Sequence, residues 1–142
     1  MKDTKFFDTN ILCYAYGTQD PAKRRICKGL VERVFDGELD GVVSGQVLGE
    51  FFSAATGKWL MPVEEVRTVI RYIIASERWQ KIDYTHKTVE TVLQRLDASR
   101  APFWDAMIAQ TMKENGIQEI ITENELDFAR ISGIKITNPF RS

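Results

Sequence analysis

The stretch "KFFDTNILCYAY", residues 5 to 16, begins with apolar residues and then meets an acidic one, Asp8. Residues 4 to 7 have the character of a short buried strand. Asp8 can cap a helix that begins at Thr9, because its carboxylate can accept a hydrogen bond from a free N–H group of the first turn. The stretch therefore predicts a strand, a carboxylate and a helix in succession, and at this point either capping or chemistry explains the carboxylate.

The composition indicates one domain. The chain has 142 residues, 44% of them hydrophobic, which is enough for a single compact core. The net charge of -1 excludes a surface that is basic throughout, so any nucleic acid would be held locally. Cys13 and Cys27 form no CxxC pattern, and no segment reaches the roughly 20 apolar residues of a membrane span. We expect one domain over residues 1–142, cytoplasmic and without a membrane partner.

Strand-like and helix-like segments alternate along the chain. After the first strand, we expect helices over residues 21–36, 46–55, 62–76, 86–98 and 102–115, strands over 41–44, 118–122 and 134–138, and a helical turn or two over 124–131. Helical spacing places Ile74 in the apolar stripe of its helix and Leu93 on the buried side of the next one. This alternation predicts an α/β fold with a parallel sheet covered on both faces.

Acidic residues recur near the ends of the expected strands. Asp8 follows the first strand, Glu50 lies in the helix after the second, Asp105 begins the helix before the next, and Glu123, Asn124 and Asp127 follow "EIIT". In parallel α/β sheets, ligands bind beyond the carboxyl ends of the strands. These side chains, although distant in sequence, can therefore meet at one edge of the sheet.

Asp105 is the most informative of these residues. Ile108, Ala109 and Met112 continue its helical face, so the carboxylate stands on an apolar stripe. Burying an unpaired carboxylate costs at least several kcal/mol, so this position calls for a cation, a strong donor or a proton. The alternative is that Asp105 meets only the positive end of its helix, an effect of about 0.3 to 1 kcal/mol.

The other acidic residues have structural explanations when each is taken alone. Glu50 can lie on the polar side of its helix, Asp127 can be a cap, and Asn124 can end the strand through an Asx-turn. The functional prediction therefore depends on the set as a whole.

Several converging carboxylates without a histidine would repel one another unless a hard cation lay between them. Oxygen ligands of this kind suit Mg²⁺ or Mn²⁺, which can acidify a water for attack on a phosphate. We therefore predict metal-dependent hydrolysis of a phosphodiester, with Asp8 and Asp105 as direct ligands. Glu50 and Asp127 would bind through water, hold a second ion or orient the nucleophile.

Several other kinds of site are excluded. His86 is the only histidine, which rules out acid–base chemistry by a histidine pair. The sequence has no zinc-type Cys/His spacing, P-loop or GxGxxG run. A phosphatase of the haloacid dehalogenase type needs a second aspartate two residues after the first, where this chain has Asn10.

Five stretches in order resemble the PIN-domain ribonucleases, and among them the VapC-like toxins of toxin–antitoxin pairs. They are "FDTNIL" (7–12), "SGQVLGEFF" (44–52), "FWDAMIAQTMKENG" (103–116), "IITENELDF" (120–128) and "KITNPF" (135–140). The resemblance implies a PIN-like three-layer α/β/α sandwich with a central parallel sheet, usually dimeric. It also implies an RNA substrate, Mg²⁺ or Mn²⁺, and inhibition by a VapB-like antitoxin whose tail enters the cleft.

The resemblance also assigns roles to residues. Asp8, Glu50 and Asp105 match the family's acidic positions, with Thr9 and Asn10 as supporting residues. At the fourth corner, Thr122 matches the usual Ser/Thr, Asn124 a position that is often Asn or Asp, and Asp127 the terminal acid, while Glu123 can substitute there. Two alternatives stay open: a PIN-like module that binds RNA or protein without catalysis, and a PIN nuclease of RNA maturation.

Overall fold

A five-stranded sheet forms the centre of the computed structural model, which describes residues 4–141. Its strands are β1 (Thr4–Phe7), β2 (Asp40–Ser44), β3 (Trp79–Ile82), β4 (Glu119–Ile121) and β5 (Lys135–Thr137). They are all parallel and lie in the order β3-β2-β1-β4-β5. The predicted parallel α/β sheet is confirmed. Strand β3 was not predicted, because this edge strand carries exposed Gln80 and Lys81.

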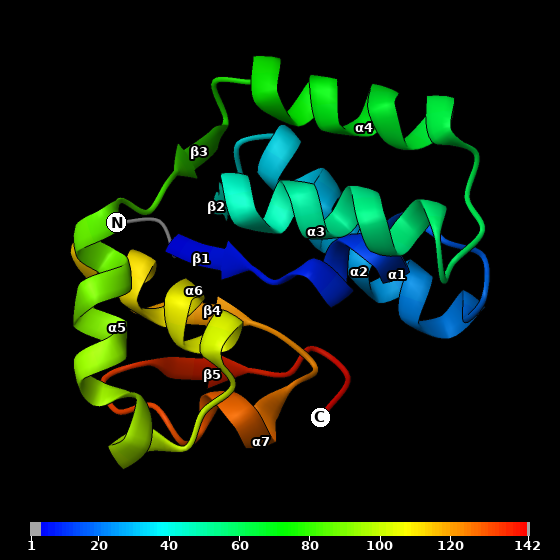
Figure 1. The fold of residues 1–142 in the computed structure, drawn as a ribbon. Coiled ribbons are helices and arrows are strands. Elements are labelled where there is room, and N and C mark those ends of the chain that lie inside the picture. The colour runs from blue at the N-terminus through cyan, green and yellow to red at the C-terminus, as the bar shows by residue number, and fades with distance from the viewer. Residues whose placement is uncertain (1–3, 142) are drawn as a thin grey trace.

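Seven helices accompany the sheet within the described residues. They are α1 (Thr9–Tyr16), α2 (Pro21–Phe35), α3 (Gly45–Thr56), α4 (Val63–Ala75), α5 (His86–Ser99), α6 (Phe103–Glu114) and α7 (Glu125–Phe128). Helix α1 contacts α2 and α3, α3 contacts α4, and α6 contacts α5 and α7 (Figure 1). Right-handed connections place α1 to α4 on one face of the sheet and α5 to α7 on the other. Within residues 4–141, no helix is long and apolar enough to cross a membrane.

Side-chain caps fix where several helices begin. The Asp8 carboxylate accepts a hydrogen bond from Thr9 N, and Ser44 Oγ accepts one from Val47 N. Thr85 and Thr88 form a reciprocal capping box at the start of α5. Asp8 and Ser44 thus turn the chain from strand to helix at the carboxyl ends of β1 and β2. That edge is where the candidate site lies.

Helices α4 and α5 bury fewer apolar residues than the sequence predicted. Ile74 and Leu93 are each 54% exposed, which corrects the expectation that both face inward. Both helices lie at the periphery, where α4 contacts α3 and α5 contacts α6, so each buries a narrow stripe. In α5 the fully buried position belongs to Thr88, whose hydroxyl donates to Glu114 at 2.6 Å.

Replacing Gly41 in β2 by alanine should lower the free energy of unfolding by about 1 to 3 kcal/mol, because the added Cβ overpacks the core. That Cβ would lie 2.6 Å from Val34 Cγ2 and 2.9 Å from Trp79 Cζ3. Gly29→Ala in α2 is the matched control, since no atom lies within 4 Å of its added Cβ. The control should stabilise the protein by about 1 kcal/mol through helix propensity. Urea unfolding measures both, and equal effects would contradict the prediction.

Candidate active site

The candidate site lies where the strand order of the sheet reverses. Asp8 follows β1 and Thr122 follows β4, and the two strands pair through Phe7 and Ile121. Asp8 N donates to Ile121 O at 3.1 Å, which continues the ladder one step beyond the strands. The chain proceeds from β1 to β2 on one side and returns to β4 on the other. Ligands of open α/β sheets bind at such a switch point, beyond the carboxyl ends of the strands.

Asp8 is held rigidly in this position. Only 5% of the residue is exposed, and its Oδ1 accepts a hydrogen bond from Thr9 N at 2.8 Å. Its Oδ2 accepts from Thr122 Oγ1 at 2.7 Å and from Asn10 Nδ2 at 3.2 Å. Burial raises the pKa of Asp8, the charge of Glu50 adds to the rise, and the hydrogen bonds oppose it. Asp8 therefore caps α1 and, at the same time, places its carboxylate at the candidate site.

Asp105 enters the site from the first turn of α6. Its Oδ2 accepts a hydrogen bond from Asn124 Nδ2 at 3.1 Å. Burial and then the charges of Asp8, Asp127 and Glu50 raise the pKa of Asp105 to about 6. The sequence places these carboxylates far apart, and the fold brings them near enough to repel one another.

Glu50 links α3 to α1 at the site. Its Oε1 accepts from Thr9 Oγ1 at 2.9 Å, and its Oε2 accepts from Gln46 Nε2 at 3.3 Å. Gln46 Nε2 also lies 3.2 Å from the carbonyl oxygen of Trp104, beside Asp105. Gln46 was not among the predicted site residues, although its place four residues before Glu50 on a helix allows such a bond.

Glu123 is turned toward cationic and aromatic side chains. It forms an ion pair with Lys23 and accepts a hydrogen bond from Tyr14 Oη at 2.6 Å. Burial works against ionisation of Glu123, but the Lys23 and Tyr14 contacts outweigh it and lower the pKa of Glu123. Lys23 Nζ also lies 4.8 Å from the centroid of the Phe140 ring. The charge of Glu123 is therefore matched by Lys23, whereas Asp8 and Asp105 form no ion pair with any residue between 4 and 141.

A cleft of about 1030 Å³ opens above these residues. Its lining includes Asp8, Thr9, Asn10, Glu50, Asp105, Glu123 and Asn124. Thr122 is fully buried behind Asp8 and contacts its carboxylate without lining the cleft. Asp127, on α7, is also absent from the lining and reaches Asp105 through its charge. Most of the predicted site residues therefore share one cleft, and Asp127 lies outside it.

The donor set fits a hard divalent cation held by few protein ligands. Within residues 4–141, no three His, Cys, Asp or Glu side chains are grouped so that they could hold a metal ion. Magnesium usually takes one or two carboxylates and keeps several waters. Asp8 and Asp105 supply such a pair. Burial raises the pKa of Asp105 most, and repulsion by Asp8, Asp127 and Glu50 adds to the rise. A cation at this position would relieve that repulsion.

Thr122→Val should lower the free energy of unfolding by about 1 to 3 kcal/mol, because it leaves buried hydrogen-bonding groups unsatisfied. Thr122 Oγ1 donates to Asp8 and accepts from Asn124 N at 2.9 Å and Asn10 Nδ2 at 3.3 Å. Valine keeps the shape and removes all three contacts. Thr122→Ser keeps the hydroxyl and serves as the control in urea unfolding. If the valine and serine variants were equally stable, the Thr122 hydroxyl would make no contribution to the free energy of unfolding.

Solved structures of similar fold include several toxins. A toxin–antitoxin complex from Klebsiella pneumoniae matches with a TM-score of 0.67 at 22% identity, over 97% of this chain and 99% of that one. Mycobacterium tuberculosis VapC20, a toxin that cleaves the sarcin–ricin loop, matches with a TM-score of 0.66 at 19% identity, over 92% and 96%. VapBC2 from Rickettsia felis, bound to a DNA fragment from its promoter, matches with a TM-score of 0.68 at 17% identity, over 95% and 98%.

At these identities the structures show a shared fold. Among curated proteins, none matches the sequence closely enough to count as a relative. The family model of the PIN domain matches residues 5–134, from β1 to the segment just before β5. That range contains each acidic residue predicted for the site. The chain belongs to the PIN domain family.

Proposed function

We propose that this protein is a metal-dependent endoribonuclease that hydrolyses RNA phosphodiester bonds and acts as the toxin of a VapBC-type pair. The observation that carries the proposal is the pair Asp8 and Asp105, which share one cleft at the switch point of the sheet. Membership of the PIN domain family and the fold shared with VapC toxins support it. Mg²⁺ and Mn²⁺ are the proposed cofactors.

In this proposal, each residue of the site has a separate role. Asp8 and Asp105 hold the metal ion, which when bound supplies Lewis acidity and an acidified water. Thr122 and Asn124 each donate a hydrogen bond to one of these carboxylates and so fix its orientation. Glu50 is fixed by hydrogen bonds to both oxygens and lines the same cleft, a placement that suits a base accepting a proton from water. Asp127 has a supporting electrostatic role in this scheme.

The proposed partners are a VapB-like antitoxin and a second copy of the chain. Two of the similar structures are described as toxin–antitoxin or VapBC complexes, which supports an antitoxin. Helix α4 lies at the periphery, where Tyr72 is 66% exposed and Ile74 is 54% exposed, so it is open to contact with a second copy of the chain. Light scattering on the purified chain measures its mass in solution and so tests the proposed homodimer. A monomeric mass would contradict it.

Removal of the metal should abolish cleavage. The purified full chain is incubated with a mixed RNA pool in EDTA, in Mg²⁺ and in Mn²⁺. We expect cleavage in either metal and a rate at least about 10²-fold lower in EDTA, because several kcal/mol of transition-state stabilisation are lost. Cleavage that continues undiminished in EDTA would refute the metal-dependent mechanism.

The toxin role has a separate test, which distinguishes it from RNA maturation. The wild-type chain and Asp8→Asn are each expressed in a bacterial host from an inducible promoter. We expect growth arrest only with the wild type, and relief when a small neighbouring gene is expressed with it. Normal growth with a chain that cleaves RNA in vitro would favour the maturation role.

A further inference from the structure

A second pocket lies away from the candidate active site, between α5, α6 and the segment that follows α7. Its volume is about 330 Å³, within the lower range of small-molecule sites. Ala106 lines this pocket, whereas the preceding residue, Asp105, lines the active-site cleft. Successive residues of a helix point about 100° apart, so α6 separates the two cavities.

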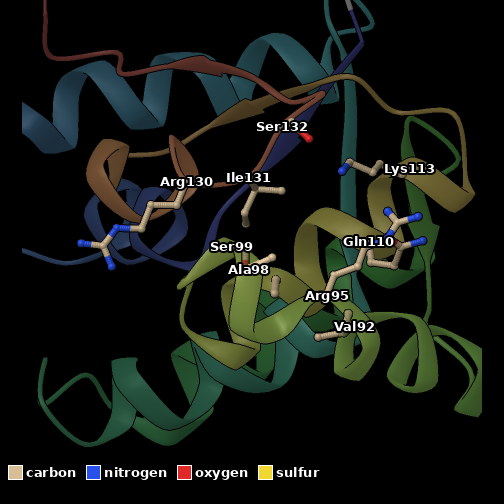
Figure 2. A pocket seen from close by; sticks show the side chains of 10 residues that line it. Val92, Arg95, Ala98, Ser99, Gln110, Lys113, Arg130, Ile131 and Ser132 are labelled. Carbon is tan, nitrogen blue, oxygen red and sulfur yellow. The ribbon is translucent and has the colours of Figure 1, made fainter.

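The charged residues that line this pocket are all cationic. Arg95 comes from α5, Lys113 from α6 and Arg130 from the turn after α7, and the lining contains no Asp or Glu. Within the part of the chain that the structure describes, none of the three forms an ion pair. Figure 2 shows Arg95 and Lys113 toward one end, Ile131 in the middle and the Arg130 side chain directed toward the other end.

The cations at the Arg95 end repel each other. Burial and then the charge of Arg95 lower the pKa of Lys113. Glu114, the next residue of α6, accepts hydrogen bonds from the neutral side chains of Thr88 and Gln110 and, among the described residues, forms no ion pair with either cation. Two neighbouring cations that form no ion pair favour an anion between them, and a guanidinium can bind phosphate oxygens in a bidentate way.

The rest of the pocket is apolar or neutral. Val92 and Ala98 of α5, Ala106 of α6 and Ile131 form walls that suit a ring or a sugar. Lys113 is half-buried and Arg95 and Arg130 are exposed, so the cavity combines cations that a ligand can reach with apolar walls. The ligand that matches has an anionic group attached to a partly apolar body.

We propose that this pocket binds a phosphate-bearing ligand of nucleotide size, with the phosphate between Arg95 and Lys113 and the organic part against Val92 and Ile131. The phosphate can belong to a free nucleotide or to a nucleotide of an RNA strand, since the recognising chemistry is the same. The proposal does not depend on the proposed nuclease activity, because no residue of the cleft takes part.

The test measures binding of AMP, inorganic phosphate, adenosine and a short RNA oligonucleotide to the full chain by calorimetry. EDTA is present throughout, so that no metal ion in the cleft can bridge to a phosphate. Arg95→Gln and Lys113→Gln each remove one cation from the pocket. Lys87→Gln, at the exposed start of α5, removes a cation from outside it and is the matched control.

We expect AMP to bind and adenosine not to bind, with AMP affinity reduced about tenfold by either pocket substitution and unchanged by Lys87→Gln. If AMP does not bind but the oligonucleotide does, and both pocket substitutions weaken it by this factor, the phosphate comes from an RNA strand. The proposal is overturned if AMP and adenosine bind equally. It is also overturned if neither AMP nor the oligonucleotide responds to the pocket substitutions more than to the control.

Discussion

Asp8→Asn should reduce RNA cleavage by at least about 10²-fold while the protein stays folded. The substitution changes one atom of the side chain and removes the charge that would hold the metal ion. A neutral amide oxygen is a weaker ligand for a hard cation than a carboxylate. Because Asp8 is only 5% exposed and fixed by three hydrogen bonds, no neighbouring side chain can move in to replace it.

The fold should survive because the asparagine keeps the helix cap and removes a buried charge. Its Oδ1 can accept from Thr9 N, whereas its amide nitrogen cannot accept from Thr122 Oγ1 and Asn10 Nδ2 as the Asp8 oxygen does. Loss of the charge removes the cost of burying it and the smaller repulsion from Glu50, which both raise the pKa of Asp8, and this gain offsets the lost contacts. Thermal unfolding in EDTA should therefore show a variant about as stable as the wild type.

The matched control is Asp97→Asn, which makes the same chemical change at an exposed position of α5. It should cleave RNA at the wild-type rate. Cleavage by a folded Asp8→Asn variant at the rate of this control would refute the assignment of Asp8 as a ligand. Loss of activity in both variants would instead indicate a general effect of charge on RNA binding.

The sequence predicted which residues share the cleft better than it predicted the contacts around them. Asp8 could be predicted because a carboxylate at the end of a buried strand is unusual, and Asp105 because it interrupts an apolar stripe. Both signals are local. The pairing of Glu123 with Lys23 is not local, since the two residues are 100 positions apart and meet only in the fold.

The same contrast explains the errors in the fold. The parallel sheet followed from the alternation of strands and helices, which is a pattern along the chain. The exposure of Leu93 depends on how much of α5 its neighbour covers, and helical spacing carries no information on that. Strand β3 was missed because an edge strand buries only its ends, Trp79 and Ile82, and exposes the two residues between them.

Asp105→Asn should abolish cleavage to a similar extent and, in EDTA at neutral pH, should make the protein more stable than the wild type. The pKa of Asp105 is raised from 3.8 to about 6 in the folded protein, so the folded state disfavours the ionised carboxylate. A rise of this size corresponds to at most about 3 kcal/mol, and solvent screening reduces the expected gain to about 1 to 2 kcal/mol. Activity and stability should therefore change in opposite directions.

The sign of the pH dependence follows from the two pKa values. Below about pH 3.8, the carboxyl group is protonated in both states and does not destabilise the wild type. Between pH 3.8 and about 6, the unfolded chain loses its proton first, so the stability of the wild type falls as the pH rises. Above that range both states are ionised and the full destabilisation remains. The stability gap between Asp105→Asn and the wild type should therefore open across this window and stay constant above it.

Urea unfolding of both proteins in EDTA at pH 4, 5, 6, 7 and 8 measures this gap. Groups that titrate alike in both proteins contribute equally to the two free energies of unfolding, so they cancel in the gap. Adding Mg²⁺ at pH 7 should then stabilise the wild type more than the variant, because only the wild type keeps both carboxylates for the ion. A gap that does not change from pH 4 to pH 8 would show that neither burial nor neighbouring charges raise the pKa of Asp105 in the folded protein. Equal stabilisation of both proteins by Mg²⁺ would show that the ion binds without Asp105. The raised pKa of Asp105 would then reflect its burial and would not indicate a cation site.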